Sequence, residues 1–210
     1  RAPSQPISYL CSHDDWTLWD KLVITMDPQR GFDQPTPAIL RANRLAVAFC
    51  FGCQGHWFLL AGEEFGRTKQ GLQDSFNAPA DLNRLDWTRA WTGPWRQLAE
   101  YYQGLMALRK QLPALCDKSE AAPRRLLGAW RPGRQCAAFL LDNKGHSHWD
   151  QLLLIYNAGR ARPAPLPAGQ WQLLADADSS TLWAEAQPTL LQDQAELPES
   201  GALILGRMHP

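Results

Sequence analysis

An unbroken apolar run from Trp57 to Ala61 restricts the possible folds of this chain more than any other segment. A run of this kind suits a strand that is buried on both faces, as the strands of a parallel sheet are. A second short strand is predicted at residues 7–11. Between them, a helix is predicted to begin after Thr36, a favourable N-cap followed by proline, and to end near Gly52. Strand, helix and strand together predict a βαβ unit.

Polar clusters follow both predicted strands. Residues 12–15 read Ser-His-Asp-Asp, and residues 62–69 read Gly-Glu-Glu-Phe-Gly-Arg-Thr-Lys. In parallel α/β folds, active sites lie at the edge where the carboxyl ends of the strands meet. The two clusters therefore predict a functional site at this edge. The long polar loop at residues 70–93 is of a length that often carries function.

The character of the chain changes after residue 113. Apolar residues at spacings of three and four predict a helix over residues 95–112, which Pro113 ends. Beyond it, short strand candidates separated by Pro, Gly and Asp turns predict an antiparallel β-sandwich over residues 114–210. The strand candidates are residues 126–131, 135–141, 152–156, 171–175, 189–191 and 202–205. The proline-rich segment 160–167 is predicted to be a surface connection.

Composition limits the possible partners. The 210 residues include 21 basic and 21 acidic side chains, so the sequence gives no electrostatic case for a nucleic acid or a membrane partner. Hydrophobic residues make up 45% of the chain, which is enough to bury a core and excludes a disordered protein. No apolar run approaches the roughly 18 residues of a membrane span.

The five cysteines indicate neither a metal site nor a disulfide framework. Cys50 and Cys53 have CxxC spacing, but no second CxxC or HxxxH completes a zinc site, so no metal or cofactor is expected. An odd cysteine count argues against a complete set of disulfides. Reduced thiols point to the cytoplasm, with a secreted or envelope-associated location as the alternative. Because the sequence begins with Arg1 and not with Met, targeting cannot be read from it.

Several segments in fixed order carry a family resemblance. They are residues 7–22, 54–69, 74–87, 101–110 and 197–205. They resemble, in turn, the seventh barrel strand, the eighth strand with its loop, the loop that follows, the last barrel helix and the closing β-domain strand of type I pullulanases. A His-Asp pair alone would mean little, but the pair at residues 13 and 14 followed by this ordered series is specific.

The resemblance implies a bacterial starch-debranching glycosidase of the alpha-amylase superfamily. Residues 1–113 would then be the last two strand–helix units of a (β/α)8 barrel, and residues 114–210 the C-terminal β-sandwich domain. The implied reaction is hydrolysis of α-1,6-glucosidic branch bonds in pullulan, amylopectin or glycogen, with retention of configuration. The implied partners are an α-glucan substrate and the N-terminal part of the barrel.

By the resemblance, Asp14 is a catalytic carboxylate that binds sugar hydroxyls and helps to stabilise the oxocarbenium-like transition state. His13 would donate a hydrogen bond to a hydroxyl of the same ring. Asn83 and Arg84 match substrate-binding positions on the non-reducing side, and Arg67 is a further substrate-binding candidate. From spacing alone, however, Asp14 would be a turn residue at a strand end.

Alternatives stay open for several of these residues. Arg84 is equally well interpreted as a surface ion-pair partner of Asp81 or Asp86. Arg67 and Lys69 are interpreted as residues that brace the site or bind substrate, and a solvated charged pair is an equally good interpretation. Asp15 stands where the family commonly has Asn, which leaves a substrate contact by that side chain in doubt.

No segment resembles the motifs that carry the family's nucleophile and general acid, so this chain is predicted to be inactive alone. Glu63 and Glu64 are near enough in the predicted sheet to pair with Asp14, but hydrogen bonds to loops or to Arg67 are the favoured interpretation.

Two further functions are considered. A sugar-binding module would arrange Trp130, Trp149, Trp171 or Trp183 as a flat exposed platform. A structural C-terminal domain would instead pack an apolar sheet face on the helix at residues 95–112. In either case two strands and two helices cannot close a barrel, so the first half is predicted to expose apolar surface.

Overall fold

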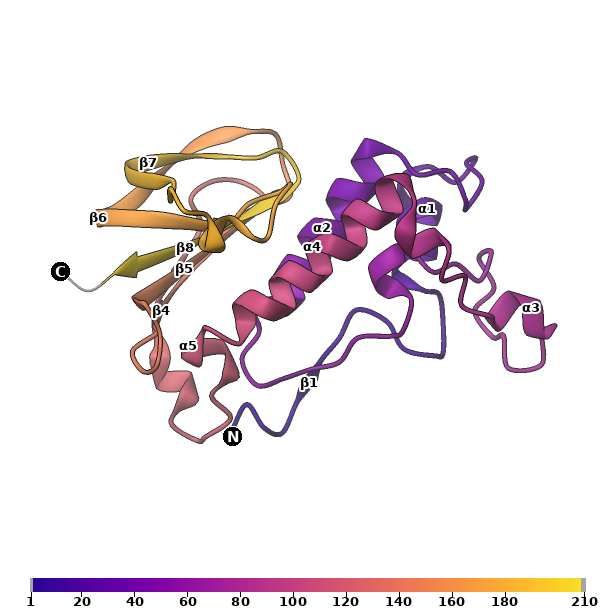
Figure 1. Cartoon of the computed structure of the whole chain (residues 1–210), viewed down its shortest axis with the longest axis horizontal. Helices are drawn as coiled ribbons and strands as arrows, with labels where there is room; N and C mark the ends of the chain where they lie inside the picture. The colour runs from indigo at the N-terminus through magenta and orange to yellow at the C-terminus, as the bar shows by residue number, and fades with distance from the viewer. Residues whose placement is uncertain (1, 209–210) are drawn as a thin grey trace.

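Helices and two very short strands make up the first half of the molecule, and an antiparallel sheet makes up the second (Figure 1). The structure, a computed structural model, describes residues 2–208. The helical half contains β1 (Ile7–Ser8), α1 (Leu18–Met26), α2 (Pro37–Phe51), β2 (His56–Trp57), α3 (Ala80–Asn83), α4 (Gly93–Arg109) and α5 (Pro113–Cys116). Short 3-10 turns lie at Glu63–Phe65, Arg89–Trp91 and Ala122–Arg125.

β1 and β2 pair in parallel, with Ile7 opposite His56 and Ser8 opposite Trp57. The predicted parallel pairing is thus confirmed, but each strand has only two residues and not five. The ladder is short because β1 and β2 form a two-stranded sheet without a third strand at either edge. After Trp57 the Phe58 amide still donates to the Ser8 carbonyl at 2.9 Å, but residues 58–60 are not part of a strand.

Helix α2 has the limits that its sequence predicts. The Thr36 hydroxyl accepts a hydrogen bond from the Ile39 amide, 3.2 Å away, and Gly52 is the C-cap. Helix α1 was not predicted as a helix. Its signal is present nonetheless, since Thr17 caps it by accepting from the Asp20 amide at 3.1 Å.

The second half is a six-stranded sheet in the order β3-β4-β5-β8-β6-β7, with every pairing antiparallel. The strands are β3 (Leu126–Trp130), β4 (Cys136–Asp142), β5 (Trp149–Asn157), β6 (Arg162–Ala175), β7 (Leu190–Leu197) and β8 (Gly201–Met208). This confirms the predicted antiparallel β-domain. A 3-10 turn at Leu182–Ala184 separates β6 from β7.

The proline-rich segment is a strand and not a surface connection. Residues 162–165 belong to β6 and pair with β7, whereas β8 pairs only with residues 172–175 of β6. The first part of β6 is therefore an edge, where one side of the backbone needs no donors. Pro163 and Pro165 are tolerated there because proline lacks only the N–H that an interior strand would use.

The sheet has a buried core on each face. On one face, Leu152 and Leu154 of β5 share a core with Leu105 and Leu108 of α4 and with residues of α2, and this core is here called the seam. Tyr156 of β5 contacts α2 directly, since its hydroxyl donates to the Ala48 carbonyl at 3.3 Å. Figure 1 shows α2 and α4 side by side, running from the sheet toward α1. The other face encloses a separate core within the β-domain, around Leu153, Ile155 and Trp171. The seam is the packing predicted for a structural C-terminal domain.

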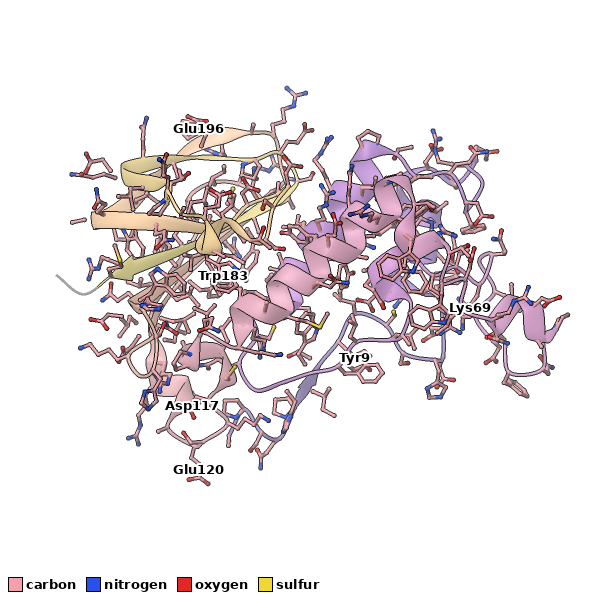
Figure 2. All side chains as sticks on the ribbon, in the orientation of Figure 1. Tyr9, Lys69, Asp117, Glu120, Trp183 and Glu196 are labelled. Atoms are coloured by element: carbon pink, nitrogen blue, oxygen red, sulfur yellow. The ribbon has the colours of Figure 1, made fainter. Side chains whose placement is uncertain are left out.

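The tryptophans of the β-domain do not form an exposed row. Trp149 is 3% exposed and belongs to the seam core, whereas Trp171 is fully buried in the opposite core. Trp130 and Trp183 are partly buried and pack against different cores, and Trp183 lies on the side of the sheet next to α4 (Figure 2). This distribution argues against an aromatic sugar-binding platform in this domain.

No helix among residues 2–208 is long and apolar enough to cross a membrane.

Candidate functional site

A pocket of about 160 Å³ lies where the loops after β1 and β2 meet. Its walls are His13, Asp14, Leu60, Arg67, Lys69, Asp74, Ser75, Phe76 and Asn83. Four of the five predicted site residues are therefore brought together from segments far apart in the sequence. The pocket is far from the β-domain, as the positions of Lys69 and Glu196 in Figure 2 show.

The two residues of the His-Asp pair are open to solvent. The side chains of His13 and Asp14 are 87% and 72% exposed, and His13 Nε2 lies 3.4 Å from Asp14 Oδ1. Asp15 has a φ of 60°, a left-handed conformation that Asn and Asp adopt more readily than other non-glycine residues. This backbone requirement explains why Asp can stand where Asn is common. Asp15 is not among the lining residues of the pocket.

Arg67 and Asn83 hold two loops together at the pocket. Arg67 donates to the carbonyl oxygens of Ala61 at 3.3 Å and Asn83 at 3.2 Å. The Asn83 side chain accepts from the Ser75 hydroxyl at 2.8 Å and donates to the Ser75 carbonyl at 2.7 Å. Because an amide side chain has two donors and two acceptor sites, Asn83 keeps one of each for a ligand.

Arg84 faces a different space. It lines a neighbouring pocket of about 360 Å³, which shares Arg67 with the first. Arg84 Nη1 lies 3.3 Å from Asp81 Oδ1, with both side chains mostly exposed, at 75% and 83%. The ion pair with Asp81 is thus formed, and the structure does not bring Arg84 to Asp14.

Phe76 and Asp20 of this region were not singled out from the sequence, and Lys69, for which a solvated pair with Arg67 was one interpretation, is not solvated. Phe76 is 86% exposed at the pocket and offers an aromatic face. Asp20 and Lys69 are fully buried, at 0% and 2%. The pattern Thr17-x-x-Asp20 marks the start of α1 and is the one sequence signal that draws attention to Asp20.

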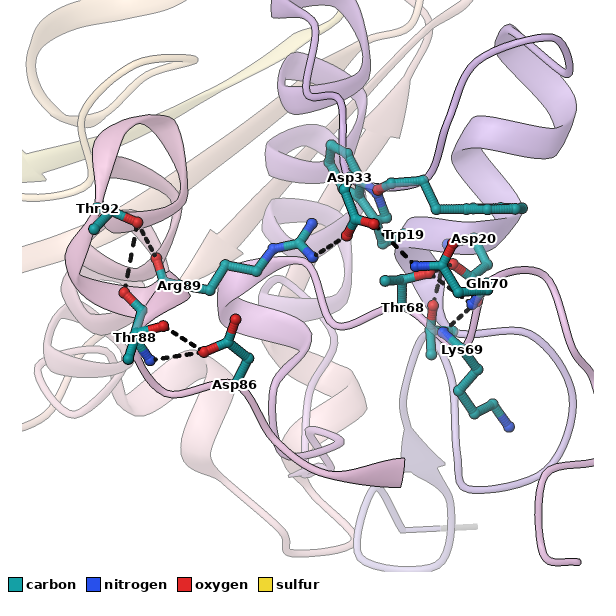
Figure 3. A network of polar contacts seen from close by, with 12 residues as sticks. Trp19, Asp20, Asp33, Thr68, Lys69, Gln70, Asp86, Thr88, Arg89 and Thr92 are labelled. Atoms are coloured by element: carbon teal, nitrogen blue, oxygen red, sulfur yellow. Dashed lines mark hydrogen bonds and ion pairs between the residues drawn. The ribbon is translucent and has the colours of Figure 1, made fainter. Parts of the chain in front are cut away.

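Asp20 fixes the loop after β2 through its carboxylate. Oδ1 accepts a hydrogen bond from the Thr68 hydroxyl, and Oδ2 accepts from the amides of Lys69 at 2.8 Å and Gly71 at 3.2 Å. Figure 3 shows Asp20 with Thr68 and Lys69, beside the ion pair of Arg89 with Asp33. Gln70 and Gly71 both have positive φ, 54° and 78°, which turns the loop tightly enough for two amides to reach one carboxylate.

Neither Glu63 nor Glu64 lines the pocket. Glu63 makes its hydrogen bonds in the protein interior, and Glu64 bonds to the main chain of its own loop. Glu63 accepts from Cys11 Sγ at 3.0 Å and lies 3.4 Å from the Tyr102 hydroxyl, and burial raises the pKa of its carboxyl to about 7. Glu64 accepts from the Gly62 amide at 2.9 Å. The predicted role in holding loops fits Glu64, but neither side chain orients Arg67, whose guanidinium donates to carbonyl oxygens.

Comparison with known proteins identifies the family. No family model matches the chain. The pullulanase of Bacillus subtilis (strain 168) is 34% identical over 157 residues, which cover 74% of this chain and 21% of that protein. The crystal structure of pullulanase type I from Bacillus subtilis str. 168, complexed with maltose, has a TM-score of 0.86 and 30% identity, covering 99% of this chain and 28% of that one. The chain belongs to the pullulanase-type debranching enzymes, as a C-terminal segment.

The chain spans less than a third of the length of each of these relatives. A glycogen debranching enzyme of Serratia proteamaculans (strain 568) is 27% identical over 216 residues, 83% of this chain and 31% of that enzyme. Other similar pullulanase structures are complexes with maltotetraose and with maltohexaose. Solved members of the family thus bind maltooligosaccharides.

Among residues 2–208, no group of three or more His, Cys, Asp or Glu side chains is arranged to hold a metal ion. All five cysteines are free in the structure. Cys50 is buried in the last turn of α2, and Cys53 is partly buried just beyond it.

Proposed function

We propose that this chain is the C-terminal portion of a glycoside hydrolase that cleaves α-1,6-glucosidic branch bonds in pullulan, amylopectin or glycogen with retention. The observation that carries the proposal is the convergence of His13, Asp14, Arg67 and Asn83 on one pocket at the ends of two parallel strands. Carboxyl ends of parallel strands are where barrel enzymes place their catalytic residues. Similarity to pullulanases over most of the chain supports the same reaction class.

In this proposal Asp14 is a catalytic carboxylate that contacts the sugar at the point of cleavage. Its exposed oxygens accept from hydroxyl groups of the ring, and a charged acceptor in that place favours the positive charge that develops in the transition state. His13 donates to a hydroxyl of the same sugar. Arg67 and the free donor and acceptor of Asn83 bind the substrate beside it, and the Phe76 ring offers a face on which a sugar can stack.

Arg84 belongs to the proposal as a more distant substrate contact. Its pocket adjoins that of Asp14 through Arg67, so a glucan chain that leaves the first pocket can enter the second. Arg84 then reaches the sugar from the rim, where it is also paired with Asp81.

The proposal assigns the nucleophile and the general acid to a part of the enzyme outside this chain. Retaining hydrolysis requires two carboxyl groups about 5 Å apart that flank the scissile bond, and in this proposal Asp14 is a third carboxylate. Glu63 and Glu64 face away from the pocket, and the second carboxylate among its described walls is Asp74. The chain alone is therefore predicted to be inactive.

We further propose that residues 1–113 are the last two strand–helix units of a (β/α)8 barrel and that residues 114–210 are a β-sandwich domain that supports it. The edges of the β1–β2 pair are open. Apolar side chains are exposed along it, with Ile7 at 60%, Tyr9 at 55% and Phe58 at 44%. Figure 2 shows Tyr9, just after β1, projecting away from the helices. Earlier barrel strands are the proposed cover for this surface.

The proposal is tested by reducing-sugar release from pullulan, measured for the 210-residue chain and for the complete enzyme that contains it. Activity in the complete enzyme alone is the expected result. Cleavage by the short chain would overturn the assignment of the nucleophile and acid, and would make Asp14 with Asp74 the catalytic pair to study. No cleavage by either protein would contradict the proposed reaction.

A further inference from the structure

Lys69 is buried in an unusual way for a lysine. The residue is 2% exposed, yet its ammonium group has no carboxylate partner among the ion pairs of the described residues. Instead, Nζ donates to two main-chain carbonyl oxygens, those of His13 at 3.0 Å and Gln73 at 2.9 Å. These carbonyls belong to the two loops that carry Asp14 and Asp74 into the pocket.

Such a placement is costly for stability alone. Burying a cation without a counter-ion is unfavourable, and natural cores rarely do so unless the group has a specific task. A methionine or leucine would fill the same volume without that cost. The two carbonyl groups explain why the ammonium is tolerated, but they do not by themselves explain why a charged side chain is used.

The backbone of Lys69 is fixed independently of its side chain. Asp20 of α1 accepts from the Lys69 amide, and Trp16 Nε1 donates to the Gly71 carbonyl at 2.8 Å. Figure 3 shows the Lys69 side chain extending away from the Asp20 carboxylate. The main chain of Lys69 is thus held by α1 and by Trp16, and its ammonium lies between the loop of His13 and the loop of Gln73.

We propose, on the basis of the glycosidase function proposed above, that Lys69 is a positioning residue for Asp14. Its ammonium holds the main chain of His13 against the loop of Gln73 and thereby fixes the carboxylate of Asp14 relative to the sugar. Lys69 lines the pocket, but its hydrogen bonds are to the protein main chain, so it acts through Asp14 and not on the substrate. A misplacement of about 1 Å in such a group lowers a rate by about 100-fold.

The test uses the complete enzyme and compares Lys69→Met with wild type for pullulan hydrolysis, each also in an Asp14→Asn background. A residue that works through Asp14 matters only while Asp14 is present, so the two effects are not additive. The expected result is a fall in kcat of about 100-fold in the wild-type background and little further loss in the Asp14→Asn enzyme. Equal loss in both backgrounds would overturn the proposal and leave Lys69 a structural residue.

Lys21→Met is the matched control. Lys21 also donates to a main-chain carbonyl of the first strand segment, that of Leu10 at 3.4 Å, but it lies outside the pocket. The kcat of the Lys21→Met enzyme is expected to stay close to that of wild type. A loss equal to that of Lys69→Met would show that any lysine of this region has the same effect, which also contradicts a positioning role.

Hydrogen exchange of the backbone amides in residues 12–15 and 73–76 tests the proposal without an activity measurement. Lys69→Met is expected to raise exchange in both segments and to leave the seam unchanged. If Lys69→Met does not fold, Asp20→Asn loosens the same loop with the ammonium retained, and the same non-additivity with Asp14→Asn is expected. A wild-type enzyme that does not cleave pullulan would instead refute the proposed function, which separates the two failures.

Discussion

The seam, where α2 and α4 meet the sheet, is stabilised in a different way from the pocket around Asp14. In the seam, Leu105, Leu108 and Leu152 are completely buried and make apolar contacts. At the pocket, His13 and Asp14 are mostly exposed, and the loops that carry them are held by buried polar side chains. The difference indicates that the seam supplies stability to the whole segment, whereas the pocket depends on a few directed hydrogen bonds for its shape.

The largest expected effect is on activity at the pocket. Asp14→Asn in the complete enzyme is expected to lower kcat for pullulan by about 100- to 1000-fold, the usual loss when a group that stabilises transition-state charge is removed. Thermal unfolding should hardly change, because the side chain is 72% exposed. Asp15→Asn is the control, since Asn keeps the left-handed backbone and the residue does not line the pocket. Full activity of Asp14→Asn would exclude Asp14 from catalysis.

The second effect is on stability at the seam. Leu105→Ala is expected to reduce the free energy of unfolding by about 2–5 kcal/mol, because it leaves a cavity in a fully buried core. The neighbouring Met106→Ala is a matched control, since Met106 is 36% exposed and its loss should cost much less. Urea unfolding measures both. Similar costs for the two variants would mean that α4 does not rest on the sheet as described.

These two regions also differ in how far the sequence predicts them. Spacing of apolar residues predicts α4, and the N-cap Thr36 with Gly52 predicts α2 to within a residue, because both depend on local patterns. The β-domain follows from its alternating strands and turns. The prolines of β6 misled the prediction, because whether a strand is an edge depends on which neighbours it has in the folded sheet.

The pocket could be predicted only in part. Strand ends and the family resemblance single out His13 and Asp14, and the structure brings both to one pocket with Arg67 and Asn83. The partners of Lys69 escaped prediction, because its ammonium meets a carbonyl 56 residues away, which no local pattern records. Arg84 was left between two interpretations, and its ion pair with Asp81 is the one that a spacing of three residues on a short helix allows.

The third effect is the pH dependence of stability, and it depends on Glu63, which lies between Cys11 and Tyr102 of α4. Burial raises the pKa of Glu63 from 4.5 in the unfolded chain to about 7 in the folded protein, where it contacts Cys11 and Tyr102. Between these values the folded state keeps a proton that the unfolded state loses, so stability falls as pH rises from about 4.5 to 7. The total change is on the order of 3 kcal/mol.

Glu63→Gln is the variant that isolates this carboxyl. It keeps the shape of the side chain without a titrating group, so the fall in stability across this pH window should shrink. Chemical unfolding of both proteins at pH 5 and pH 8 measures the difference. Glu64→Gln is the control, because Glu64 is less buried and binds the Gly62 amide. An unchanged pH dependence in Glu63→Gln would show that Glu63 titrates normally in the folded state.

The smallest effect separates the two interpretations of Arg84. If Arg84 binds glucan from the rim, Arg84→Ala raises KM for pullulan by less than about tenfold, which corresponds to 1.4 kcal/mol, and leaves kcat unchanged. Asp81→Ala removes the same ion pair but keeps the guanidinium, so it should not raise KM. Neither variant should change the free energy of unfolding by more than about 1 kcal/mol, because exposed ion pairs contribute little. If both variants raise KM equally, the ion pair orders the loop and Arg84 does not contact the sugar. The pocket of Asp14 would then be the whole of the substrate site that this chain contributes.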